Sequence, residues 1–201
     1  MIRIYNQELL QQAEAILGEN IIGVTNLLTS TSHKIDKSNK STVTKTYVMY
    51  LAPADSSGLK TRNGKLINLC AFKTTCEKIC LGIASGRMNQ GQSRIDTGEF
   101  DWSLSSVSQA MLKRTRLFIE NRPAFYERLY FEIDRALRTA QKNNMSIAVR
   151  LNGTSDIRWE SNNPELFTRY PQITYYDYTK YPLAQRLKAL SLPNYHLTYS
   201  F

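Results

Sequence analysis

Residues 146–180 read SIAVRLNGTSDIRWESNNPELFTRYPQITYYDYTK, and this stretch decides the fold. Two apolar runs of strand length, 146–151 and 172–178, flank a short helix or turn at 163–171. The chain then repeats this order, with a helical pattern over 183–192 and a third strand-like segment at 195–201. Strands that alternate with helices imply right-handed crossovers and parallel pairing. We therefore expect an α/β fold, built as an open parallel sheet or a partial (β/α) barrel.

Two long helical patterns and a strand precede this stretch. The apolar run 47–52 predicts a buried strand, and helical periodicity follows over 103–121 and 124–144. In the second helical pattern the apolar side chains recur every four residues and predict a core-facing stripe. Its members are Phe125, Leu129, Ile133 and Leu137.

The N-terminal segment has a different character. Residues 4–17 place leucines and alanines at helical spacing, whereas 29–45 is rich in Ser, Thr and Lys, a composition typical of a mobile connection. We therefore expect two parts. An N-terminal helical appendage with its polar connection spans 1–45, and an α/β domain spans 46–201.

Polar side chains follow two of the predicted strands at the point where each strand ends. Asn152–Asp156 comes directly after the first, and Tyr178–Lys180 ends the second. The carboxyl ends of parallel strands meet at one edge of a sheet, where ligands bind in α/β proteins. The alternative is that Asn152–Asp156 caps the next helix and Lys180 is solvated.

Arg150 lies within the first of these strands, and a buried guanidinium requires a partner. Asp156 or Asp177 could supply the carboxylate. The predicted site has Asp156 for acid/base work and Lys180 for anion binding, and both are the candidate catalytic residues. The candidate substrate-binding residues are Arg150, Asn152, Ser155 and Tyr178.

All three cysteines of the chain, Cys70, Cys76 and Cys80, lie within eleven residues. Three thiolates can hold a four-iron cluster with one exchangeable iron, which in radical S-adenosylmethionine enzymes binds the cosubstrate. Zinc is the alternative metal and requires a fourth ligand. Two other interpretations stay open: packed structural thiols and a disulfide pair.

The charge balance bears on partners and location. The 201 residues include 26 basic and 17 acidic side chains, a net charge of +9. This excess favours a nucleic acid or a phosphorylated, anionic small molecule as partner. No secretory signal or membrane-spanning run is visible, so we expect a cytoplasmic protein without membrane contact. The expectation of an anionic partner is also supported by a basic run on the first long helix, Lys113, Arg114, Arg116 and Arg122. We expect that Lys113 and Arg114 do not both face the core.

Several strings of the chain resemble, in the same order, a family of phage and plasmid proteins. They are YLAPADSSG, the cysteine segment, KRTRLFIENRPAF, VRLNGTSDIRWE and YYDYTK, within residues 47–201. The family is catalogued as a domain of unknown function and is similar to phage gene-product families with radical-SAM-like signatures. The resemblance implies a phage origin, a location in an infected or plasmid-bearing bacterial host, and a shared architecture.

Two functions compete on this basis. The first is a phage-encoded α/β protein with a cysteine-bound iron–sulfur or other metal site, of radical-SAM-like enzyme type, with a polar pocket at the strand ends. The second is a non-catalytic, basic, nucleic-acid-binding phage protein whose thiols are structural or hold zinc.

Overall fold

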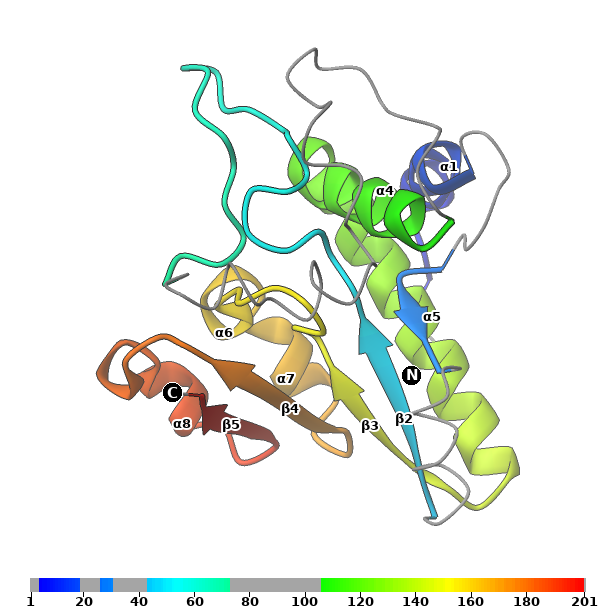
Figure 1. Cartoon of the computed structure of the whole chain (residues 1–201). Coiled ribbons are helices and arrows are strands. Elements are labelled where there is room, and N and C mark those ends of the chain that lie inside the picture. Colours follow the sequence, from blue (N-terminus) through cyan, green and yellow to red (C-terminus); the bar gives the residue numbers. More distant parts are fainter. Residues whose placement is uncertain (1–3, 19–25, 31–42, 73–105, 201) are drawn as a thin grey trace. The chain divides into compact units, whose positions relative to one another are not determined.

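The computed structural model of the chain describes residues 4–18, 26–30, 43–72 and 106–200 (Figure 1). The chain divides into two compact units. Residues 1–27 and 51–129 form the first, and residues 28–50 and 130–201 form the second, so the division falls within a long helix. Each unit is described separately below.

Helices dominate the described part of the first unit. They are α1 (Gln7–Gly18), α4 (Ser106–Glu120) and the first turns of α5 (Arg122–Lys142). The N-terminal helix predicted for 4–17 is confirmed, and its apolar face is buried through Leu10, Ala13 and Leu17. Polar bonds hold α1 to α5: Arg128 pairs with Glu14 at 2.9 Å.

The second unit contains a five-stranded sheet in the order β1-β2-β3-β4-β5. The two-residue β1 pairs antiparallel with β2, whereas β2 to β5 are parallel, so the expected α/β fold is confirmed in its open-sheet form. The strands are β1 (Leu28–Thr29), β2 (Thr44–Met49), β3 (Ser146–Arg150), β4 (Thr174–Thr179) and β5 (Tyr195–Tyr199).

The strand predicted at 47–52 begins and ends three residues earlier. Its first half is polar, yet the parallel partner β3 pairs with it from Thr44 onward. The hydroxyl groups of Thr44 and Ser146 lie 2.7 Å apart and share a hydrogen bond at this end. Pairing with a neighbouring strand therefore extends β2 into a segment that its composition alone marks as a connection.

Short helices connect the last three strands: α6 (Trp159–Asn162) and α7 (Glu165–Arg169) follow β3, while η3 (Leu183–Gln185) and α8 (Leu187–Leu190) follow β4. They pack on one face of the sheet. From α7, the Phe167 ring lies 4.9 Å from the ring of Tyr175 and 4.6 Å from that of Tyr195. We call this the helix face of the sheet.

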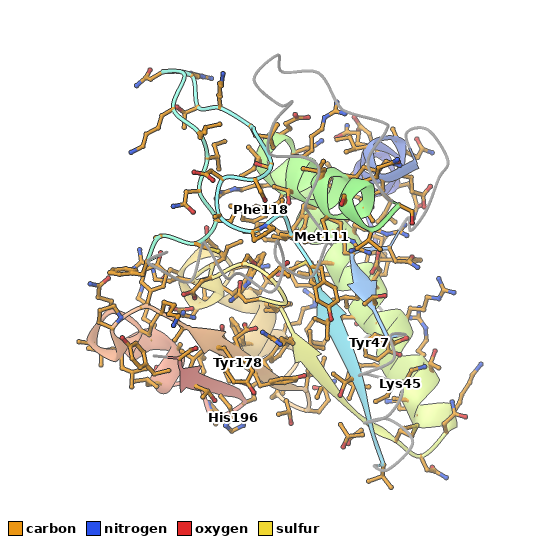
Figure 2. The ribbon with its side chains drawn as sticks, in the orientation of Figure 1. Lys45, Tyr47, Met111, Phe118, Tyr178 and His196 are labelled. Carbon is orange, nitrogen blue, oxygen red and sulfur yellow. The ribbon has the colours of Figure 1, made fainter. Side chains whose placement is uncertain are left out.

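The opposite face of β4 and β5 is exposed or half-buried. Because side chains alternate along a strand, β4 buries Tyr175, Asp177 and Thr179 on the helix face and presents the residues between them to the other side. Figure 2 shows Tyr178 and His196 on these neighbouring strands. We call this side the open face; its residues are Arg150, Thr174, Tyr176, Tyr178, His196 and Thr198.

Candidate functional site

Asn152, directly after β3, organises the loop that leads to α6. Its side-chain carbonyl accepts hydrogen bonds from the Ser155 hydroxyl at 3.0 Å, the Ile157 amide at 2.9 Å and the Trp159 indole at 3.0 Å. The nitrogen of its side-chain amide donates to the Ile157 carbonyl and to the Asp177 carboxylate. Every polar atom of this buried side chain is therefore used to fix the loop.

Gly153 allows the loop to approach the end of β2 closely. Its amide donates to the Met49 carbonyl at 2.9 Å. A Cβ atom at this position would lie 2.6 Å from that carbonyl oxygen and 2.6 Å from Cδ1 of Tyr50. Only glycine fits this approach without displacing backbone.

Asp177 lies on the helix face of β4, with 1% of its surface exposed. Its carboxylate accepts the Asn152 backbone amide at 2.7 Å, the Asn152 side-chain amide at 3.1 Å and the Tyr195 hydroxyl at 2.9 Å. Burial raises the pKa of Asp177 to about 7, although these donors and the charges of Arg150 and Arg186 oppose the rise. Asp177 was not among the predicted site residues.

Asp156 joins the ends of β3 and β4. Its carboxylate accepts the Thr179 hydroxyl at 2.9 Å and the Lys180 backbone amide at 2.7 Å. Burial raises the pKa of Asp156 against these bonds. Asp156 does not cap the helix that follows, because Arg158 occupies the N-cap position of α6 and no side chain makes a capping hydrogen bond there. The polar ends of the two strands thus meet at one edge of the sheet.

Arg186, between η3 and α8, is a further residue of this network that was not among the predicted site residues. Its side chain is fully buried, and all five of its N–H groups donate. Nε and Nη2 bind both oxygens of Glu160 at 2.7 and 3.1 Å, and Nη1 lies 3.4 Å from Asp156. The remaining bonds go to the Thr179 and Tyr195 hydroxyls.

One sequence signal could have indicated Arg186. The helical pattern over 183–192 has leucines at 183, 187 and 190, a spacing typical of a core-facing side. In the structure these leucines are exposed, and Arg186 lies on the buried side of the segment. An arginine between two leucines of a helical pattern is a weak signal of a buried arginine. It becomes informative only when a carboxylate is known to lie nearby.

Of the two carboxylates expected as possible partners of Arg150, Asp156 and Asp177, Asp156 pairs with another arginine. Asp156 pairs with Arg186, and Arg150 lies at the open face instead. There its Nε donates to the Asn152 carbonyl at 3.2 Å, and its guanidinium lies 4.9 Å from the centre of the Tyr178 ring. The alternation of side chains along β3 explains the difference, because residue 150 points away from the face on which Asp177 is buried.

The predicted site residues therefore divide between two sides of the sheet. Asn152, Ser155 and Asp156 belong to the buried network, whereas Arg150 and Tyr178 lie on the open face. Lys180 is half-buried and contributes its backbone amide to Asp156. The structure brings the two strand ends together, as predicted, but it does not gather all six side chains in one place.

Of the predicted metal ligands, the structure describes Cys70, in the first unit. This half-exposed residue accepts a hydrogen bond at Sγ from the Ala54 amide, 3.3 Å away. Cys76 and Cys80 lie outside the described residues, as does most of the predicted connection at 29–45. Within the described ranges, no group of three or more His, Cys, Asp or Glu side chains could hold a metal ion.

The basic run of α4 is less available than expected. Lys113 and Arg114 are both buried, with 2% and 3% of their surfaces exposed. Arg114 donates from Nε to the Asn26 carbonyl at 2.7 Å. The expectation that they cannot both be buried is wrong, because long basic side chains can bury their stems while the charged ends find oxygen acceptors.

The open, mostly parallel sheet with helices on one face defines the class: an α/β protein with a buried polar network at the carboxyl ends of its strands. The sequence model of the phage-type family Gene product 88 matches residues 25–201, and the chain belongs to that family. No curated protein and no solved structure matches the chain. Among the described helices, none has the length and apolar character to cross a membrane.

Proposed function

We propose that this Gene product 88 family member binds nucleic acid through the open face of its sheet. The observation that carries the proposal is the exposed Tyr178 ring with the Arg150 guanidinium over it, beside Tyr176 and His196 on a face that the unit's short helices do not cover. Aromatic rings and arginines on a flat surface are the groups that contact bases and phosphates.

The charge of the chain supports the same proposal. A net charge of +9 attracts a polyanion and releases its counterions on binding.

The buried network at the strand ends is poorly suited to catalysis. Asp156 and Asp177 are almost fully buried, and their oxygens already accept bonds from the loop, from β4 and from Tyr195. A group for acid/base work must reach the substrate.

The test is binding of fluorescein-labelled oligonucleotides, followed by anisotropy, from about 50 to about 200 mM salt. We expect binding that weakens as salt rises, and a salt slope that falls by about 1 in Arg150→Gln, which removes one phosphate contact. Lys188→Gln is the matched control, since this exposed lysine lies on α8. Absence of binding at the lowest salt, or equal losses of affinity in Arg150→Gln and Lys188→Gln, would contradict the proposal.

A cysteine-bound iron–sulfur centre is a second proposal. It rests on the confinement of Cys70, Cys76 and Cys80 to eleven residues and on the amide hydrogen bond to Cys70 Sγ, a contact of the kind that tunes such clusters. A four-iron cluster with an open iron would bind S-adenosylmethionine and make the protein a radical-SAM-like enzyme. Zinc is the alternative occupant of the same thiolates.

Anaerobic purification tests this second proposal. We expect a brown protein whose iron and sulfide content falls sharply in Cys70→Ala, or, for zinc, a colourless protein whose zinc content falls in the same variant. The hydroxyl-for-thiol variant Cys70→Ser is the control for packing, since it keeps the size of the side chain. Colourless, metal-free protein would refute metal binding and leave structural thiols or a disulfide.

A further inference from the structure

We propose that the open face selects single-stranded over double-stranded nucleic acid, with one unpaired base stacked on Tyr178 and a second on Tyr176; this rests on the proposed function above. The two tyrosines follow each other on the same side of β4. Tyr178 is 48% exposed, and Tyr176 is half-buried beside it.

The spacing of the two rings favours unstacked bases. Residues two apart on a strand are separated by about 6.6 Å, roughly twice the 3.4 Å rise between stacked bases of one strand. Each ring therefore matches a base that has left the stack. Such bases are available in single strands and loops, whereas a duplex keeps them paired and stacked.

The breadth of the sheet disfavours a duplex as well. The open face lies on three strands, β3 to β5, because Val48 of β2 points to the same side but is buried. The major groove of DNA is about 12 Å wide and admits a helix or a two-stranded ribbon. A three-stranded face is broader than the two-stranded ribbon that the groove admits, so base contacts on the open face require exposed bases.

Arg150 holds the stacking surface in place and supplies its charge. Its guanidinium lies 4.9 Å from the Tyr178 ring centre while Nε donates to the Asn152 carbonyl, in the loop that the buried network fixes. Burial raises the pKa of Tyr176 and the charge of Arg150 lowers it, so the arginine acts on both tyrosines. A cation beside the rings attracts the phosphates between the stacked bases.

His196 adds a further aromatic ring to this face. Its Cα pairs in register with that of Tyr176 on the neighbouring strand, and its side chain is exposed. The open face thus presents two rings, a guanidinium and an imidazole on adjacent strands. This combination of stacking groups with basic groups is the one that single-strand binding requires.

The experiment compares three labelled probes with the full chain: a thymidine oligonucleotide of about 20 nucleotides, the same length of abasic backbone, and a duplex of that length. We expect the thymidine strand to bind more tightly than the other two. Tyr178→Leu should weaken thymidine binding by about 5- to 150-fold, the equivalent of about 1–3 kcal/mol for one stacked base, and leave duplex binding and the salt slope unchanged.

Two variants serve as controls. Tyr178→Phe keeps the ring and should retain binding, and Tyr199→Leu removes a partly exposed tyrosine of β5 that is not part of the open face and should have no effect. Equal affinity for all three probes, with Tyr178→Leu unchanged, would overturn the stacking inference while nucleic-acid binding itself stands. Absence of binding to every probe would overturn both.

Discussion

Arg186→Met is expected to destabilise the second unit by about 3–5 kcal/mol, the cost of leaving buried carboxylates without their cation. Glu160 has 1% of its side chain exposed and binds Arg186 through both oxygens, while Asp156 lies against the same guanidinium. Removing the arginine leaves two acidic groups and two hydroxyls without their donor. The free energy of unfolding, measured in urea by circular dichroism, gives the size of the effect.

Arg169→Met is the matched control, because Arg169 and Glu165 form an exposed pair one turn apart on α7. Exposed pairs contribute about 0–1 kcal/mol. In the double variant Arg186→Met, Glu160→Leu the loss of unfolding free energy should be smaller than the sum of the losses in the two single variants. The reason is that the unpaired carboxylate is removed together with its partner. Equal, small effects of Arg186→Met and Arg169→Met would show that the buried pair does not hold the unit together.

Asp177→Asn is expected to remove a large pH dependence of stability. The pKa of Asp177 rises from 3.8 to about 7 because burial disfavours the carboxylate. The folded protein therefore binds the proton more tightly than the unfolded chain, and the unfolding free energy falls as pH rises from about 4 to about 7. The total contribution is about 4 kcal/mol at 1.36 kcal/mol for each pKa unit.

Asparagine does not titrate, so the variant lacks this dependence. Between pH 4 and pH 8 the unfolding free energy of the parent should fall by about 4 kcal/mol relative to that of the variant. The hydrogen bonds that asparagine cannot reproduce toward Asn152 and Tyr195 lower stability equally at every pH. Glu165→Gln, on the exposed end of α7, is the control for a carboxylate on the surface. A difference that stays constant with pH would mean that Asp177 ionises at its ordinary pKa.

The order of strands and helices followed from the sequence. In 146–201, strand-length apolar runs alternate with helical patterns, and a chain with that alternation pairs its strands in parallel. Polar residues at the ends of two such runs predicted that the carboxyl ends of β3 and β4 meet. The bond between Asp156 and the Lys180 amide confirms this, because local pattern and connection rules suffice to bring neighbouring strands together.

The partners of the buried charges were decided by the tertiary structure alone. The separation of Arg186 from Glu160 by 26 residues, and the choice of Arg186 over Arg150 for Asp156, depend on how η3 and α8 fold back onto the helix face of the sheet. Strand alternation places Arg150 and Tyr178 on the open face, but it does not show which face the helices cover. Sequence patterns report local geometry, whereas the neighbour of a buried charge is set by packing between segments far apart in the chain.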